Sequence, residues 1–571
     1  MDIALTLKII NLIYKFTNSR HNELPDNFSN YVTGFLEASP HDDIKISKNS
    51  TLNRKYIDKF IYELKQDNRV NLAGIGIMHG GKLIKEEYIY PHTSSYRHVS
   101  FSMSKSIVSM AVGIAIDKKI LSLNEHLVDI FPEHDSVFIK RGMKNVTIES
   151  LLTMTSGVSF DEISAFFSED WCLAYMGSDI KYESESEFSY NSLNTYMLVA
   201  AICKKSNMSF QNFLYLNLFK YMGINDVTWD KCPQGIEIGG WGLKLSLMDM
   251  LKLGQLYLNE GKWIVDNKEV RLIDANWVKE STRRQVSLND KEVISGYGYQ
   301  IWILKDGAYL FNGLFGQNIY VNPNKNLVIA VMASAYEVFP GGTLVRKICD
   351  FANDDLLYHR GFITNIKNIV KKPKYDLIKR NKIRYDAETF FTVISDYLDN
   401  KYIFYDYSAS ILPICVQGFY SMFSMGIRSL RFKRIKSDLF MIVEENDTEF
   451  TIQLGYVDNE FKYQIIDYGG KQMPMAAYCS LAFDEDDRFM LKIRLVFLEE
   501  VGERILKIFF SSNSITLKGI ESPDLKEFVG ILFGESRLRG KQLTNKINMP
   551  DYLEYKVDKI LSPVSKGDVN I

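Results

Sequence analysis

Residues 100–116 have the sequence SFSMSKSIVSMAVGIAI, in which Ser102 and Lys105 stand three positions apart at the start of a long apolar segment. Residues three apart lie on one face of a helix, so this spacing places an amine within reach of a hydroxyl. Apolar surroundings lower the pKa of a lysine, and a neutral amine can take the serine proton and make the oxygen nucleophilic. The segment therefore predicts a helix that carries the nucleophile and base of an acyl-transfer site without a histidine. A serine N-cap followed by a solvated lysine is the alternative, and the rest of the chain decides between them.

Composition indicates a globular protein of more than one domain. Its 571 residues exceed what one hydrophobic core holds, and 46% of them are hydrophobic and 13% aromatic. A formal net charge of −2 gives no global field that would attract nucleic acid or an anionic membrane. The six cysteines are far apart in sequence, which is typical of reduced thiols in a cytosolic protein. The eight histidines lack zinc-binding spacings, so we expect no metal and no other cofactor.

The first 45 residues are predicted to form a helical extension, because Leu5, Ile9, Leu12 and Ile13 can share one apolar helix face. The segment lacks the basic start and the cleavage site of a secretion signal. A helix that docks on the core is favoured over a membrane anchor. No later apolar run reaches the ~20 residues that a membrane-spanning helix needs. We therefore expect a cytoplasmic protein without stable membrane insertion.

Residues 46–360 are predicted to form one α/β unit. The segment 71–90 has the pattern of a β-hairpin, and residues 120–285 are mostly helical in pattern. Strand character returns at 296–334, and a helix near 342–355 closes the unit. This order predicts an α/β sandwich in which one sheet is assembled from both ends of the domain.

The composition changes after residue 360. Residues 361–385 are rich in lysine, arginine and asparagine and are predicted to be a basic linker, not a nucleic-acid site. Within residues 386–571, a helix near 386–400 precedes short alternating segments such as EFTIQLGY and RFMLKIRLVFL. Regular short strands of this kind predict an antiparallel β-barrel or sandwich. The predicted fold class is therefore α+β, with an α/β sandwich followed by this β-rich domain.

Six ordered motifs connect the first domain with a known family; they are residues 99–134, 146–158, 188–202, 218–230, 239–263 and 312–334. With these motifs, about half of the chain resembles the serine β-lactamase and penicillin-binding-protein superfamily. The resemblance is strongest to its class C-like branch of esterases and 6-aminohexanoate-dimer hydrolases. It implies an antiparallel sheet combined with a helical subdomain. The C-terminal domain resembles the lipocalin-like domains of some related peptidases.

The resemblance implies a role for several side chains. Ser102 would be the nucleophile, at a helix N-terminus where the dipole favours negative charge. Lys105 would accept its proton or support a second base. Tyr190, in Tyr190-Asn191-Ser192, would carry the proton to the leaving group, since a nearby lysine cation favours its phenolate. Ser192 is expected to hydrogen-bond Lys105 or a substrate amide.

The third family motif is a Lys-Thr-Gly or His-x-Gly strand, and the matching residues 314–317 (LFGQ) carry no cation. Gly316 would allow close approach of the backbone, and the Gln317 amide would pair with the Ser102 amide as an oxyanion hole. A missing cation disfavours substrates with a carboxylate, such as penicillins. A neutral ester or amide fits the motif better.

Two features precede Tyr190 in the chain. Trp171 lies where relatives place aromatic residues that contact the substrate, so it is predicted either to cover the substrate or to belong to the core. Asp161 and Glu162 are expected to be solvated.

We therefore predict a metal-independent serine hydrolase that cleaves an ester or amide of a small molecule or peptide through an acyl-enzyme on Ser102. One alternative is an acyl transferase, peptide cyclase or thioesterase of the penicillin-binding-protein type, in which an amine replaces water. The other alternative is a non-catalytic binding protein that retains the fold. The absence of a cation from the third motif is the reason to consider it. The C-terminal domain is expected to shape the rim of the site or to mediate homo-oligomerisation.

Overall fold

The computed structural model describes residues 46–47, 51–134, 141–165, 168–288, 293–335, 341–358, 385–405, 409–420, 422, 424–458, 460–484, 486, 488–523 and 562–569. They belong to two compact units, one ending before residue 360 and one beginning after it. The predicted N-terminal extension lies outside the described residues, and so does the predicted linker except for its last residue.

The first unit is built on an antiparallel sheet. Within the described residues its strands follow the order β2-β1-β13-β12-β11-β10-β9-β8. These strands are β1 (Leu72–His79), β2 (Lys82–Tyr88), β8 (Val286–Ser287), β9 (Ile294–Tyr297), β10 (Trp302–Leu304), β11 (Tyr309–Gly313), β12 (Gln317–Asn322) and β13 (Leu327–Ala333). Strand β1 pairs directly with β13, with Ile75 opposite Val331 and Ile77 opposite Ile329. The prediction that one sheet is assembled from both ends of the domain is confirmed.

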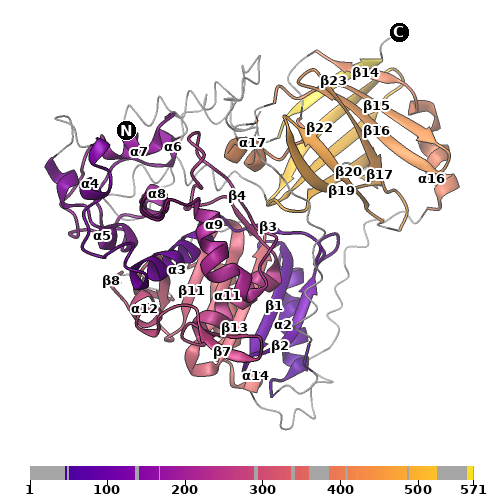
Figure 1. Cartoon of the computed structure of the whole chain (residues 1–571). Coiled ribbons are helices and arrows are strands. Elements are labelled where there is room, and N and C mark those ends of the chain that lie inside the picture. The colour runs from indigo at the N-terminus through magenta and orange to yellow at the C-terminus, as the bar shows by residue number, and fades with distance from the viewer. Residues whose placement is uncertain are drawn as a thin grey trace. The chain divides into compact units, whose positions relative to one another are not determined.

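Helices cover both faces of this sheet (Figure 1). On one face α11 (Leu247–Leu258) packs on β13, β12 and β1, and α3 (Ser104–Asp117) packs against β11 and α8 (Ser192–Ser206). On the other face α2 (Arg54–Gln66) and α13 (Thr343–Asn353) share a separate hydrophobic core with the sheet. The predicted α/β sandwich with a helical subdomain is thereby confirmed.

Shorter elements complete this unit. The helices are α4 (Leu127–Ile130), α5 (Ile148–Leu152), α6 (Glu162–Ala165), α7 (Trp171–Met176), α9 (Phe210–Leu214), α10 (Lys220–Met222), α12 (Ala275–Ser281) and α14 (Asp355–Tyr358). The strands are β3 (His98–Val99), β4 (Thr228–Trp229), β5 (Leu243–Leu245), β6 (Lys262–Val265) and β7 (Lys268–Arg271).

The second unit is a nearly closed antiparallel barrel, which confirms the predicted β-rich domain. Its described strands follow the order β17-β16-β15-β14-β23-β22-β21-β20-β19-β18. They are β14 (Lys401–Phe404), β15 (Ile427–Ile435), β16 (Asp438–Glu445), β17 (Thr448–Leu454), β18 (Lys462–Tyr468), β19 (Lys471–Phe483), β20 (Phe489–Phe497), β21 (Glu503–Phe510), β22 (Ser514–Ser522) and β23 (Val564–Val569). The barrel would close between β17 and β18, the two ends of this order. The Gln464 side chain of β18 bridges this gap, because it accepts from the Gln453 N–H of β17 at 3.0 Å and donates to the Gln453 carbonyl at 2.9 Å.

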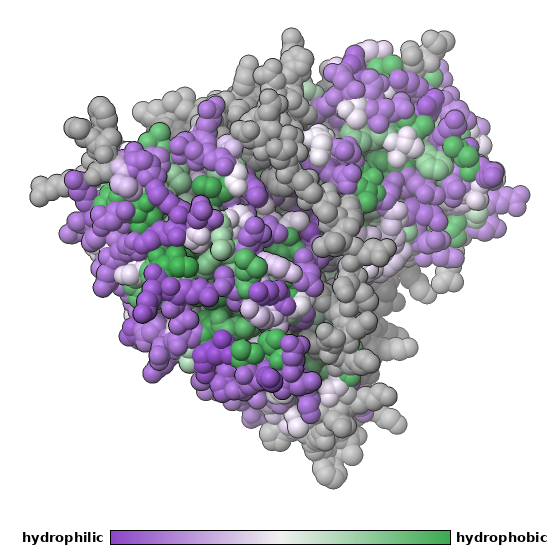
Figure 2. Space-filling model, in the orientation of Figure 1, coloured by the Kyte–Doolittle hydropathy of each residue, from purple (hydrophilic) through white to green (hydrophobic). Residues whose placement is uncertain are grey.

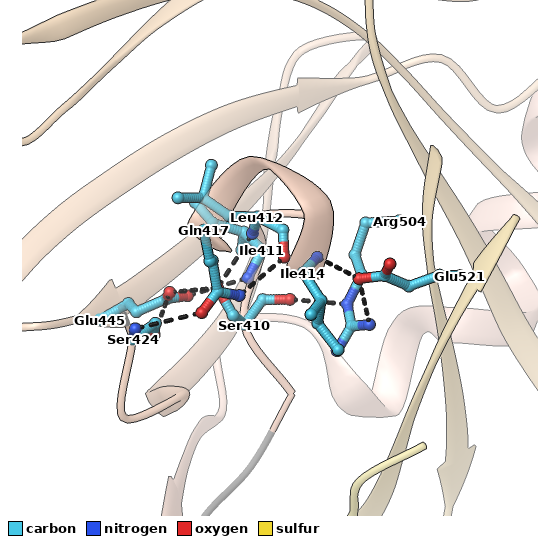
Figure 3. A network of polar contacts seen from close by, with 9 residues as sticks. All are labelled: Ser410, Ile411, Leu412, Ile414, Gln417, Ser424, Glu445, Arg504 and Glu521. Atoms are coloured by element: carbon cyan, nitrogen blue, oxygen red, sulfur yellow. Dashed lines mark hydrogen bonds and ion pairs between the residues drawn. The ribbon is translucent and has the colours of Figure 1, made fainter. Parts of the chain in front are cut away.

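Among the described residues of this unit, the helices α16 (Ala387–Ile394) and α17 (Ile414–Tyr420) accompany the barrel. Buried charged side chains anchor α17 and the residues that flank it (Figure 3). The Glu445 carboxylate is fully buried and accepts from the Ser410 hydroxyl at 2.5 Å and the Ile411 N–H at 2.9 Å, and also from the Ser424 hydroxyl. Nearby, Arg504 donates to the Ser410 carbonyl at 3.0 Å. Since an unpaired buried charge is costly, this network holds the α17 segment in one position on the barrel.

The face of the molecule in Figure 2 is mainly hydrophilic, with hydrophobic residues in scattered groups. None of the described helices combines the length and the apolar character needed to cross a bilayer.

Candidate active site

Ser102 lies in a tight 3-10 turn, Phe101–Met103, directly before helix α3. The backbone of Phe101 is left-handed, with φ of 46°, and so is that of Phe315, with φ of 60°. Such a conformation costs a side-chain-bearing residue on the order of 1–3 kcal/mol. Both rings are buried and pack edge to face, with centroids 5.5 Å apart. Their packing holds the serine turn against the loop that follows β11.

Lys105 occupies the first turn of α3, and its side chain is only 1% exposed. Its Nζ donates to Ser102 Oγ at 2.8 Å and to the Gly240 carbonyl at 2.8 Å. Burial lowers the pKa of Lys105 to about 7, although the negative charge of Glu162 raises it. Near neutral pH a large fraction of the amine is therefore unprotonated and able to accept a proton.

Tyr190 lies beside the amine, with Lys105 Nζ 4.9 Å from the centre of its ring. The ring stacks on Trp302 at 5.8 Å and meets Tyr297 edge-on at 6.4 Å. Desolvation raises the pKa of Tyr190, a hydrogen bond with Ser102 lowers it, and the charge of Glu162 raises it. The net direction is upward, so the side chain is a phenol at neutral pH. This differs from the expectation of a favoured phenolate, because desolvation is the largest of these effects on the pKa of Tyr190.

Ser192 is the first residue of α8 and is buried. Its N–H donates to Glu162 Oε1 at 3.1 Å. A side chain on Gly240 would come within 2.7 Å of the Ser192 carbonyl oxygen, so only glycine lets these two backbones approach. This approach brings the Gly240 carbonyl, in place of the predicted Ser192 hydroxyl, to the Lys105 amine.

The glycine that approaches the serine turn is Gly313, at the end of β11. A Cβ on Gly313 would lie 2.1 Å from the Ser100 carbonyl oxygen and 3.2 Å from the Met103 nitrogen. Gly316, with φ of 92°, instead faces Leu344 and two alanines. The side-chain amide of Gln317 is buried and donates to the Ala333 carbonyl at 2.6 Å, so this side chain is held within the sheet. The sequence pointed to Gly316, whereas Gly313 makes the close contact.

Trp171 opens helix α7 and is 3% exposed. Its indole N–H donates to the Ser168 carbonyl at 3.1 Å. The ring meets Tyr196 edge-on at 5.2 Å and Trp241 at 5.9 Å. This packing favours the core alternative over the substrate-covering one.

Sequence reasoning missed two side chains that organise this region. Glu162 was expected in solvent, yet it bonds Ser192 and influences the pKa of both Lys105 and Tyr190. Gln300 is buried and donates to the carbonyls of Leu151 and Leu152, so it ties α5 to the sheet. In the sequence, Glu162 stands beside Asp161 and has no feature that sets it apart from other acidic residues. Among the described residues, no group of histidine, cysteine, aspartate or glutamate side chains could hold a metal ion.

Comparison with known proteins gives a match to one family model. The model described as Beta-lactamase matches residues 57–342, which is half of the chain. No curated protein matches.

Solved structures with a similar fold have low sequence identity. A putative 6-aminohexanoate-dimer hydrolase from Bacillus anthracis is 19% identical, with a TM-score of 0.44 over 51% of this chain and 81% of that chain. A penicillin-binding-protein homologue from Pyrococcus abyssi, described as octameric, is 16% identical, with a TM-score of 0.42 over 78% of this chain and 98% of that one. A family VIII carboxylesterase is 14% identical, with a TM-score of 0.43 over 52% and 97%.

Proposed function

This chain belongs to the Beta-lactamase family, and from that premise we propose that it is a serine hydrolase that cleaves an ester or amide through an acyl-enzyme on Ser102. One observation carries the proposal. The buried Lys105 amine, whose pKa is about 7, lies 2.8 Å from the Ser102 hydroxyl oxygen. A neutral amine at hydrogen-bond distance is what a serine needs in order to lose its proton.

In the first step Lys105 accepts the hydroxyl proton while Ser102 Oγ bonds to the carbonyl carbon of the substrate. The carbonyl oxygen becomes negative in the tetrahedral intermediate. Backbone N–H groups of Ser102 and of the turn from Gly313 to Gln317 are our candidates for stabilising it. The close approach of Gly313 to the serine turn supports this choice.

In the second step the bond from carbon to the leaving group breaks, and the leaving group takes a proton. Tyr190 supplies that proton as a phenol and is reprotonated by the Lys105 ammonium. The raised pKa of Tyr190 and the 4.9 Å between its ring and Lys105 Nζ support this order. A water molecule then attacks the acyl-enzyme, gives its proton back through the same groups, and releases Ser102.

The proposed substrate is a neutral ester or amide. The loop at residues 314–316 has no cation that would pair with a substrate carboxylate, and the carboxylate of Glu162 lies near the site. A carboxylate next to the scissile bond would therefore gain no partner and would be repelled.

The test is covalent labelling of the full-length protein with a fluorophosphonate, followed by intact-mass measurement. We expect one adduct on the wild type and none on Ser102→Ala. An unlabelled wild type, or equal labelling of the two proteins, would contradict the proposal and leave a non-catalytic binding protein. A peptidyl thioester then distinguishes acceptors, because water gives a linear acid and an internal amine gives a cyclic product.

A further inference from the structure

We propose that Glu162 is a positioning residue of the acyl-transfer site: it clamps the Tyr190–Ser192 segment beside Ser102 and adds a negative charge to the site. The inference rests on the proposed function of Ser102 and goes beyond it, since it assigns a role to a side chain that no motif covers.

The first argument is the contact between Glu162 and helix α8. Glu162 Oε1 accepts the N–H of Ser192 at 3.1 Å, and Ser192 is the first residue of this 15-residue helix. The first N–H groups of a helix have no partner within it, and its N-terminus favours a negative charge. The carboxylate therefore fixes the point at which the Tyr190 motif enters the helix.

A second set of bonds joins the Tyr190 motif to the residues that precede Glu162. The Asn191 side chain donates to the carbonyls of Val158 and Phe160 at 3.2 and 2.8 Å. Its own Oδ1 accepts the N–H of Leu193 at 2.9 Å and caps the helix. Segment 158–162 and the Tyr190 motif are thus joined by three side-chain hydrogen bonds. A shift of Glu162 would move Tyr190 relative to Ser102.

The third argument is electrostatic. Glu162 raises the pKa of both Lys105 and Tyr190, so its carboxylate acts on the base and on the proton donor. Among the described residues, Tyr190 is a titratable group beside Lys105, with its ring centre 4.9 Å from Nζ, and Tyr297 meets Tyr190 edge-on. Both tyrosines have raised pKa values and are neutral near pH 7. Glu162 thus supplies the negative charge that opposes desolvation of the amine.

The effect on Lys105 has a sign that can be measured. Removal of the negative charge lowers the pKa of Lys105, so the amine loses its proton at lower pH and stays reactive in more acidic solution. The acidic limb of a pH profile, which follows the protonation of Lys105, should therefore move toward acid. A purely structural role would lower the rate without moving this limb.

The experiment measures the second-order rate of Ser102 labelling by a fluorophosphonate between pH 5 and 10, which needs no knowledge of the natural substrate. Glu162→Gln keeps an oxygen for the Ser192 N–H and removes the charge. We expect its acidic limb to shift down by ~0.5–1 pH unit with a plateau within about twofold of wild type. Glu162→Ala also removes the hydrogen bond, and its plateau should fall by about tenfold or more.

Two variants serve as controls. Asp161→Asn removes a charge one residue away from Glu162. The Asp161 side chain accepts hydrogen bonds from the N–H and the hydroxyl of Ser164, three residues on. The pH profile of this variant should match that of the wild type. Glu162→Asp keeps the charge and shortens the side chain, so it should lower the plateau without the acid shift.

The outcomes separate the two proposals. An unmoved acidic limb in a folded Glu162→Gln protein, or an equal shift in Asp161→Asn, overturns the role of Glu162 while labelling of Ser102 still stands. An acid shift in Glu162→Asp overturns it as well, and this variant decides the matter if Glu162→Gln does not fold. If the wild type is not labelled at all, the proposed function fails and the inference fails with it.

Discussion

Replacement of Lys105 by arginine tests whether this side chain is a base or only a fixed cation. An arginine at this position keeps the positive charge but holds its proton at every pH an enzyme meets. The sequence left two roles of Lys105 open, since the side chain either accepts the Ser102 proton or supports a second base. Both roles predict activity for the wild type. They make opposite predictions for the variant.

The magnitude follows from the protonation state. With a pKa of about 7, roughly half of the Lys105 amine is neutral at pH 7. At the ordinary value of 10.5 only about one molecule in 3,000 would be neutral. In Lys105→Arg the neutral fraction is below about one in 10⁵, so base catalysis from this position ends. Loss of a general base typically costs about 10²–10⁴ in rate, and we expect a loss of about 10³.

The assay is the pH dependence of Ser102 labelling by a fluorophosphonate, repeated with kcat/KM for a p-nitrophenyl ester. The wild type should lose activity as the pH falls through about 7, the pKa of Lys105, because protonation removes the base. Lys105→Met controls for the length of the side chain and lacks both base and cation. If Lys105→Arg keeps more than about a tenth of the wild-type rate and its limb near pH 7, the amine is not the base.

Three further variants test the proton donor, the packing of α3 and the barrel. Tyr190→Phe should lower kcat for an alkyl ester or an amide, whose leaving group must take a proton, by about 10²-fold while Ser102 remains labelled, because only the proton donor is lost; an unchanged kcat for such a substrate would exclude Tyr190. Gly113→Ala should lower the melting temperature, since the new methyl would lie 2.3 Å from Trp277, and overpacking of about 1–3 kcal/mol exceeds the helix-propensity gain of about 1 kcal/mol. Glu445→Ala should speed amide exchange in α17 and in residues 409–413, because each buried donor that loses its acceptor costs about 1–3 kcal/mol; unchanged exchange would show that the network does not hold α17.

Features that depend on neighbouring residues could be predicted from the sequence. The three-residue spacing of Ser102 and Lys105 is a helical spacing, and their polar atoms lie 2.8 Å apart. Alternating segments gave the strands of the sheet and of the barrel, because strand periodicity is local. The order of the elements, strands followed by a helical insertion and further strands, predicted that one sheet is assembled from both ends of the domain. The structure shows that β1 and β13 are the strands that pair there.

Features that depend on distant contacts could not be predicted in this way. The Gly240 carbonyl that accepts from Lys105 is 135 residues away in the chain. Glu162 looked like one of many surface acids, since its bond to Ser192 forms only when α6 and α8 are both in place. The direction of the Tyr190 pKa was missed for a related reason. A sequence shows a nearby lysine, whereas desolvation appears only after the side chains have packed.

Three costly features of the first unit lie beside Ser102 and bear on the same chemistry. Two phenylalanines accept a left-handed backbone, and their packing keeps the serine turn against the end of β11. Lys105 is buried where its charged form is disfavoured, so between its folded pKa of about 7 and the ordinary 10.5 the unfolded chain binds the extra proton. Stability therefore rises with pH across that interval, and below pH 7 the full penalty is present. The same desolvation that weakens the fold at neutral pH leaves part of the amine unprotonated and able to accept the Ser102 proton, so a more stable site with a solvated lysine would hold almost no unprotonated amine at neutral pH.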